Sequence, residues 1–268
     1  MNVGSLFSGI GGIEIGFERQ GFKTKWFVEN DEYAKAVLRK RFPGTLVYGD
    51  ITEIDFRSLP GVDVLTGGFP CQDISNAGKR AGIEGSRSSL WKYYAEAIRV
   101  LRPKFVFIEN VSAILGRGLN VVLGDLAEVG YDAEWHCVSA SSVGAHHRRD
   151  RIFIIAYPSD ASDSGYEWFG GEQCSEVLQE KNRNVENSER NRIRKRNSEE
   201  VDRGKEECQH TNKFECTGWW AVEPGLGRVA DGVPNRVDRI RCLGNAVVPQ
   251  VAEVFARAIK EKWCEVER

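Results

Sequence analysis

Residues 6–17 read LFSGIGGIEIGF, an apolar strand end followed by a glycine turn and the start of a helix. Glycine lets the backbone approach a ligand closely, because no Cβ stands in the way. The stretch is not the dinucleotide fingerprint G-x-G-x-x-G, since Glu14 stands where the third glycine is required. It therefore predicts the opening strand, turn and helix of an α/β fold and disfavours a dehydrogenase.

The same alternation continues to about Tyr157. Apolar runs such as VDVLTGG (62–68) and FVFIENV (105–111) indicate strands, and between them lie segments such as LWKYYAEAIRVLR (90–102), with apolar residues at helical spacing. Alternation of this kind predicts the fold class α/β, with a doubly wound, mostly parallel sheet. Ligands of such sheets bind at the carboxyl ends of the strands.

Composition divides the remainder of the chain. Residues 160–218 are rich in Glu, Arg, Lys, Asn, Ser and Gly, with few aliphatic side chains, and make a poor core. Both a solvated insertion and a surface that contacts nucleic acid fit this composition. The stretch NAVVPQVAEVFARAIKEKW (245–263) predicts a helix that begins near Pro249 and closes the fold.

Charge and cysteine content restrict the possible ligands and the cellular location of the protein. The formal net charge of -2 provides no overall attraction to a polyanion, so nucleic-acid binding would need a local basic cleft. The seven cysteines form no close CxxC pair and the N-terminal residues lack a signal-peptide pattern, which favours a reducing, cytoplasmic location. No apolar stretch approaches the roughly 20 residues of a membrane span, so no membrane contact is expected. We expect no metal site, because Cys208, His210 and Cys216 lack paired ligand spacing.

Acidic residues follow the predicted strands at the edge where a ligand is expected. Glu29 comes about 20 residues after the glycine turn, where a carboxylate can accept hydrogen bonds from two ribose hydroxyls. Asp50 follows the next strand and can accept a hydrogen bond from an adenine amino group. Either acid alone would suit a helix cap equally well. Together with the glycine turn they predict an adenosine pocket.

A thiol and a carboxylic acid are predicted at the same edge. GGFPCQDIS (67–75) presents Cys71 directly after a buried strand, with Pro70 restricting the backbone before it. An isolated cysteine is usually a small buried hydrophobe. However, IENV (108–111) ends the neighbouring strand at Glu109. This convergence predicts covalent attack assisted by an acid.

The sequence resembles the DNA cytosine-5 methyltransferases over nearly the whole chain except residues 160–218. Seven pieces occur in the family's order: LFSGIGG, VEND, GDI, GGFPCQ, ENV, HHRRDR and LGNAVVPQV. The resemblance implies a Rossmann-like methyltransferase fold, S-adenosyl-L-methionine as methyl donor and double-stranded DNA as substrate, in a restriction-modification or phage setting. It divides the chain into a catalytic and cofactor-binding domain (1–158), a charged insertion with a small, loop-rich recognition region (159–235) and a C-terminal segment that completes the first domain (236–268).

The resemblance also implies a role for each site residue. Cys71 would add to C6 of a flipped-out cytosine, Glu109 would hydrogen-bond the base, and Arg149 and Arg151 would hold the active-site loop and the base O2. The implied cofactor-binding residues are Phe7, Gly9, Ile10, Gly11, Glu29, Asp50, Ile51, Pro70, Leu90, Asn245 and Val247. The implied DNA-binding residues are Gln72, Ser75, Lys79 and Arg80, in a segment that would otherwise be a plain surface loop.

Several alternatives stay open. A tRNA cytosine-5 methyltransferase can share these motifs, and a catalytically silent DNA-binding protein can share the fold. Asn30 stands where the family often has an aromatic that stacks on adenine. Trp219 and Trp220 would anchor a recognition lobe or pack in a hinge, and the arginines of the late segment, among them Arg239 and Arg241, would bind phosphates or be solvated. A cognate restriction endonuclease is a candidate partner, and we expect a monomer.

Overall fold

The computed structural model describes residues 1–70, 90–116, 118–160 and 234–266. The strands are β1 (Asn2–Leu6), β2 (Lys23–Val28), β3 (Leu46–Tyr48), β4 (Val64–Gly67), β5 (Phe105–Val111), β6 (Tyr131–Val138) and β7 (Arg151–Pro158). The helices are α1 (Gly12–Arg19), α2 (Glu32–Arg41), α3 (Trp91–Leu101), α4 (Leu119–Glu128), α6 (Arg236–Asn245) and α7 (Pro249–Val266). Short 3-10 turns lie at η1 (Ile51–Glu53), η2 (Phe56–Ser58), η5 (Ser112–Gly116) and η6 (Ala140–Val143).

The seven strands form one sheet in the order β3-β2-β1-β4-β5-β7-β6. Neighbouring strands from β3 to β5 pair in parallel, whereas β7 is antiparallel to both β5 and β6. The chain grows from β1 toward β3 and then returns to place β4 on the other side of β1. The predicted doubly wound, mostly parallel sheet is thus confirmed, and its switch point lies between β1 and β4.

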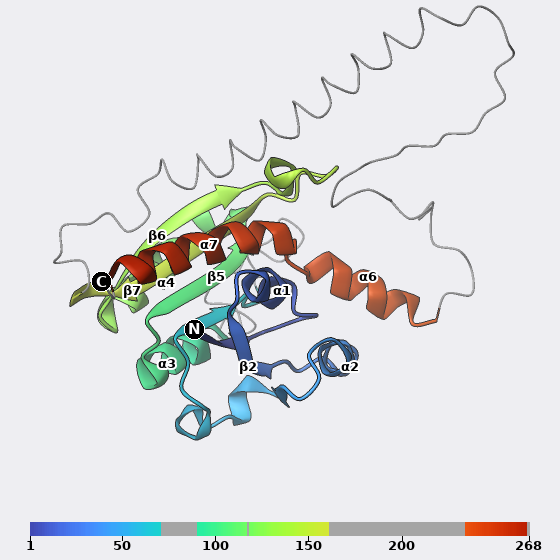
Figure 1. Ribbon diagram of the computed structural model, residues 1–268, viewed down its shortest axis with the longest axis horizontal. Coiled ribbons are helices and arrows are strands. Elements are labelled where there is room, and N and C mark those ends of the chain that lie inside the picture. The colour runs from blue at the N-terminus through green and yellow to red at the C-terminus, as the bar shows by residue number, and fades with distance from the viewer. Residues whose placement is uncertain (71–89, 117, 161–233, 267–268) are drawn as a thin grey trace, which may run out of the picture.

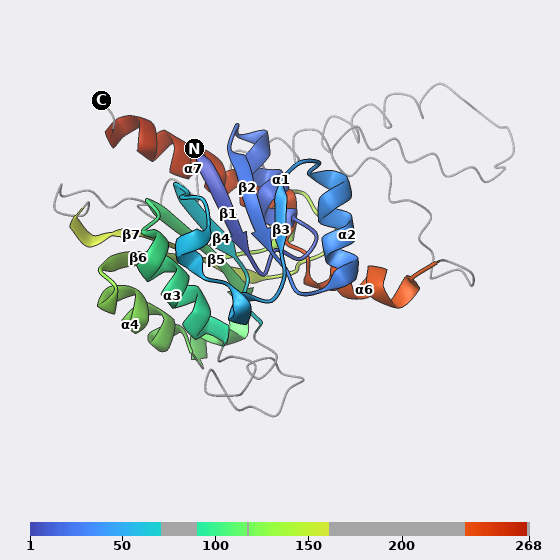
Figure 2. The same ribbon diagram turned by 90° about the horizontal axis from the view of Figure 1, so that it is seen from below.

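Helices cover both faces of the sheet. α1 and α7 lie on one face, and α3 and α4 lie on the other (Figures 1 and 2). Side chains alternate along the strands, as a sheet buried on two faces requires. In β5, Phe105 and Phe107 pack toward α7, whereas Val106 and Ile108 pack toward α3 and α4. The core therefore has two layers separated by the sheet.

The C-terminal helix begins at Pro249, as the sequence predicts, and packs along α1. Two glycines of α1 allow this close approach. A Cβ on Gly12 would lie 2.4 Å from the Val247 carbonyl oxygen, and one on Gly16 would lie 2.5 Å from the Pro249 carbonyl oxygen. The segment before α7 is consequently held against the glycine turn of β1 and α1. None of the helices in the described ranges is long and apolar enough to cross a membrane.

Candidate active site

A cavity of about 630 Å³ lies at the carboxyl ends of the parallel strands. Its lining includes Phe7, Glu29, Asp50 and Gly68, which follow the ends of β1, β2, β3 and β4, and Glu109 of β5. The opposite wall comes from α6 and the segment before α7. The cavity therefore lies at the switch point of the sheet, where doubly wound folds bind their ligands.

The glycine turn shapes the floor of this cavity. Gly9 has φ 55° and Gly11 has φ 80°, both in the left-handed region that favours glycine. A Cβ on Gly9 would meet no atom within 4 Å, so the backbone there is open. A Cβ on Gly11 would lie 2.6 Å from the Phe42 ring, so Gly11 serves helix packing instead. Phe7 and Gly9 line the cavity, whereas Gly11 does not and Ile10 lines an adjoining one.

Backbone groups orient the two acids predicted to hold adenosine. Glu29 accepts hydrogen bonds from the Gly9 N–H at 2.7 Å and the Asp31 N–H at 2.8 Å. Asp50 accepts the Thr52 N–H at 2.9 Å and so caps η1, and its second oxygen lies 3.5 Å from the Asn30 amide nitrogen. Asp50 is thus a cap and a cavity residue at once. Each carboxylate keeps lone pairs for a ligand, because a carboxylate accepts about four hydrogen bonds.

An ion pair lines the cavity beside β5 and β7. Glu109 near the end of β5 is 2.9 Å from Arg151 Nε at the start of β7, across an antiparallel pair of strands. Burial raises the pKa of Glu109 to about 7, although the positive charges of Arg151 and Arg149 act in the opposite direction. A Cβ on Gly68 would lie 2.7 Å from Glu109 Oε2. Glycine at this position therefore leaves the room that the carboxyl group occupies.

The chain that leads to Cys71 is anchored beside the same cavity. Phe69 is buried and packs against Trp91, with ring centroids 5.0 Å apart. The Asn110 side-chain amide donates to the Phe69 carbonyl oxygen at 3.3 Å. Pro70, the residue before Cys71 in the sequence, lines the cavity. Asn110 carries no role in the sequence-based prediction, although it belongs to the ENV piece.

The structure brings most of the predicted residues together. Those that line the cavity are Phe7, Gly9, Glu29, Asp50, Ile51, Pro70, Leu90, Glu109, Arg151, Asn245 and Val247. The guanidinium of Arg149 instead donates to the carbonyl oxygens of Gly244 and Ala246, each at 2.6 Å. The predictions for Cys71, Gln72, Ser75, Lys79 and Arg80 lie outside the described residues.

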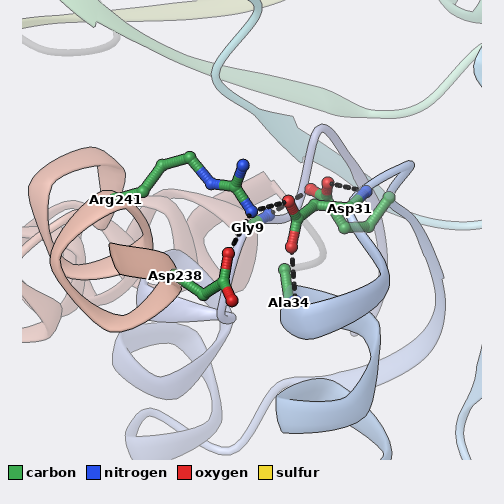
Figure 3. A network of polar contacts seen from close by, with 6 residues as sticks. Gly9, Asp31, Ala34, Asp238 and Arg241 are labelled. Atoms are coloured by element: carbon green, nitrogen blue, oxygen red, sulfur yellow. Dashed lines mark hydrogen bonds and ion pairs between the residues drawn. The ribbon is translucent and has the colours of Figure 1, made fainter. Parts of the chain in front are cut away.

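A polar network at the outer wall was missed by the sequence analysis. Arg241 of α6 pairs with Asp31 before α2 and with Asp238 of its own helix, as Figure 3 shows. Both Arg241 and Asp31 line the cavity. Arg241 is therefore neither a plain solvated side chain nor an unpaired phosphate ligand. The partners are 210 positions apart, and no local sequence pattern links them.

The fold is that of a Rossmann-like enzyme domain, with this cavity at the switch point of its sheet. The family of C-5 cytosine-specific DNA methylases matches residues 1–220. The chain therefore belongs to the C-5 cytosine-specific DNA methylase family.

Named relatives agree with this assignment. The chain is 44% identical over 164 residues to the type II methyltransferase M2.BsuMI of Bacillus subtilis, covering 58% of this chain and 42% of the relative. It is 38% identical over 156 residues to the type II methyltransferase M.NgoBI of Neisseria gonorrhoeae, covering 57% and 49%. The chain thus spans less than half the length of these two relatives.

Solved structures share the architecture. A protein described as a DNA modification methyltransferase encoded within an Escherichia coli prophage superposes with a TM-score of 0.51 at 28% identity, over 60% of this chain and 48% of the other. The Entamoeba histolytica methyltransferase EhMeth superposes with a TM-score of 0.51 at 23% identity, over 59% and 52%. The second comparison supports the fold alone.

Proposed function

We propose that the protein is a DNA (cytosine-5-)-methyltransferase. The observation that carries the proposal is the ion pair of Glu109 and Arg151, with side chains 12% and 21% exposed. This pair lines the cavity together with Pro70, the residue before Cys71. Membership of the C-5 cytosine-specific DNA methylase family and the type II methyltransferases among its relatives support it.

The cavity fits S-adenosyl-L-methionine, which supplies an electrophilic methyl group when bound. The carboxylate of Glu29 can accept from ribose hydroxyls, and that of Asp50 can accept from the adenine amino group. Phe7, Ile51 and Val247 offer apolar surface for the remainder of the molecule. The open backbone at Gly9 allows close approach. The other residues that would hold the cofactor are Pro70, Leu90 and Asn245.

Binding tests this assignment directly. Glu29→Ala removes the acceptor and should weaken the affinity for S-adenosylhomocysteine by about 1–3 kcal/mol, the scale of hydrogen bonds lost at a buried site. Isothermal titration calorimetry measures the change. Glu53→Ala, at an exposed position on η1, is the matched control and should bind as the unaltered protein does. Equal affinities for both variants would remove Glu29 from the cofactor site.

The chemistry proposed for the cytosine base depends on the Cys71 thiol and the Glu109 carboxyl group. The Cys71 thiolate would add to C6 of cytosine, and the new S–C bond would give C5 the electron density to take the methyl group of S-adenosyl-L-methionine, which would leave as S-adenosylhomocysteine. A raised pKa keeps part of Glu109 protonated at neutral pH, so the acid can donate to N3 and offset the charge that develops on the ring. Loss of the C5 proton to a base and elimination of Cys71 release the product. The cytosine must leave the base stack to reach these groups.

Transfer of labelled methyl groups tests the reaction. Unmethylated genomic DNA and tRNA are each incubated with the protein and with Cys71→Ala, and 5-methylcytosine is mapped at base resolution. Label in DNA that disappears in the variant is the expected result. Label in tRNA alone would move the protein to the RNA-modifying alternative. Label that persists in Cys71→Ala would exclude the covalent route.

The proposed partners follow from the same reaction. Double-stranded DNA is the substrate, and a cognate restriction endonuclease is a proposed partner because the relatives are named type II methyltransferases. A monomer in the cytoplasm, where DNA and S-adenosyl-L-methionine are both present, completes the proposal. Analytical ultracentrifugation with and without a DNA duplex measures the oligomeric state.

A further inference from the structure

Helix α6 forms one wall of the cavity but has little apolar packing against the other described residues. Cys242 is its one buried residue in the part of the chain that the structure describes. Val237, Ile240 and Leu243 are 76%, 53% and 65% exposed. Helix α7, by contrast, buries six apolar side chains against the sheet and α1: Val251, Ala252, Val254, Phe255, Ala256 and Ile259. Burial of apolar surface therefore fixes α7 far more firmly than α6.

Among the described residues, two arginines attach α6 to its neighbours through polar contacts. Arg241 pairs with Asp31 Oδ2, while Asp31 Oδ1 accepts the Ala34 N–H at 2.8 Å and caps α2 (Figure 3). Arg149 holds the C-terminal end of α6 through the carbonyl oxygens of Gly244 and Ala246. Charge-assisted hydrogen bonds of this kind are stronger than neutral ones. The position of the wall thus depends on polar contacts at two points.

The Arg241 contact also reaches the cofactor acid. The Asp31 N–H donates to Glu29, and Glu29 in turn accepts from the Gly9 N–H. Asp31 therefore joins α6 to the carboxylate proposed to hold the ribose. A change in the Arg241 pair alters the wall of the cavity and the support of Glu29 together.

We propose that the ion pair of Arg241 and Asp31 holds α6 in its position as a wall of the cofactor cavity. We call this pair the latch and α6 the latched wall. Arg241 acts as a positioning residue that slows cofactor release. The identity of the ligand rests on the proposed function, whereas the latch itself does not. The pair is partly exposed, with the Arg241 side chain at 52% and the Asp31 side chain at 29%. Solvent access lets such a pair break and reform readily.

Cys242 reports whether the wall opens. Cys242 is only 8% exposed and lines the cavity, so the access of a reagent to its thiol depends on the position of α6. Peptide-resolved mass spectrometry after treatment with N-ethylmaleimide, without cofactor, separates Cys242 from the other cysteines. Arg241→Gln should raise the labelling rate of Cys242 about two- to fivefold, the scale of a lost partly exposed ion pair. Arg239→Gln, exposed on the same helix, is the control and should label as the unaltered protein does.

Further variants distinguish loss of the ion pair from a general disturbance of the fold. Asp31→Asn keeps a good N-cap for α2 and removes the charge, so it should raise labelling as Arg241→Gln does. The double variant should add little, and Arg241→Lys should restore most of the protection. Equal Cys242 labelling in Arg241→Gln and in the unaltered protein would overturn the proposal. Additive effects in the double variant would overturn it as well.

Cofactor release is the second readout. In stopped-flow displacement, Arg241→Gln should release S-adenosylhomocysteine about two- to fivefold faster, while Arg239→Gln releases it at the unaltered rate. Release of S-adenosylhomocysteine from Arg241→Gln at the unaltered rate would show that the ion pair does not slow release. It would overturn the role proposed for Arg241. Failure of every form to bind S-adenosylhomocysteine, with labelling as expected, would refute the cofactor assignment and leave the latched wall standing.

Discussion

Glu109 shows how its surroundings set the chemistry of one carboxyl group. The side chain ends a buried strand, and loss of hydration disfavours its charged form more than Arg151 favours it, which raises the pKa to about 7. Sequence reasoning places Glu109 at the correct sheet edge. The pKa depends on the depth of burial and on Arg151 from the antiparallel strand β7, neither of which the local pattern ENV contains.

This pKa predicts how stability depends on pH. The folded protein binds the Glu109 proton up to about pH 7, whereas the unfolded chain releases it near 4.5. The folded state therefore holds more protons between these values, and the contribution of Glu109 to the free energy of unfolding falls as pH rises. Glu109→Gln does not titrate. The free energy of unfolding of the unaltered protein minus that of Glu109→Gln should decline between about pH 5 and about pH 8 in urea denaturation, and a constant difference would contradict the raised pKa.

Gly68 gives a second prediction for a single residue. A Cβ there would displace the Glu109 carboxyl group, since only 2.7 Å separates the two positions. Gly68→Ala should lower the rate of methyl transfer at least about tenfold, the effect expected when a catalytic group loses its geometry. Its binding of S-adenosylhomocysteine should change little. Gly61→Ala, where an added Cβ meets no atom within 4 Å, should transfer methyl groups normally; a comparable loss there would point to a general effect.

Two of the helices differ in what holds them in place. α7 packs its apolar side chains on α1 and the sheet, whereas the described attachments of α6 rest mainly on Arg149 and Arg241. The sequence pattern locates α7 correctly because its apolar residues recur at helical spacing. The same pattern cannot show that Gly12 and Gly16 of α1 are the surface that receives it. That pairing joins segments more than 230 positions apart.

Replacing either of two helical glycines by alanine should change the free energy of unfolding, in opposite directions. Gly16→Ala would place a Cβ 2.5 Å from the Pro249 carbonyl oxygen and 2.7 Å from the Glu253 nitrogen. We expect it to lower the free energy of unfolding by about 1–3 kcal/mol through overpacking. Gly124→Ala in α4, with no atom within 4 Å of the added Cβ, should raise it by about 0.5–1 kcal/mol. Thermal denaturation followed by circular dichroism measures both, and stabilisation of both variants would refute the close packing of α1 on α7.

At the scale of the whole molecule, the last segment completes the core formed by the first domain. Phe255 of α7 packs against Phe107 of β5 and Phe153 of β7, with ring centroids 5.4 Å and 5.0 Å apart. This packing supports the predicted boundary at residue 236, which stays a prediction.

Truncation tests that boundary. A chain ending after Asn235 loses four large buried apolar side chains of α7, each contributing about 1.5–3 kcal/mol. Their sum is comparable with the total stability of a typical domain, about 5–15 kcal/mol. The shortened chain should show no cooperative unfolding transition in urea. A control that lacks only residues 267–268 should unfold as the full chain does, and cooperative unfolding of the short form would contradict a shared core.

The sequence by itself determined the alternation of strands and helices up to about Tyr157, the helix that begins at Pro249, the doubly wound class and the acids that follow individual strands, but it did not predict α6. These features depend on local periodicity and on the rule that parallel strands end at one edge. Only the tertiary structure decided that Arg149 binds the end of α6, that Arg241 joins Asp31, and that Glu109 has a raised pKa. Each of these depends on the distance between groups far apart in the chain and on their removal from water, and those quantities exist only once the chain has packed.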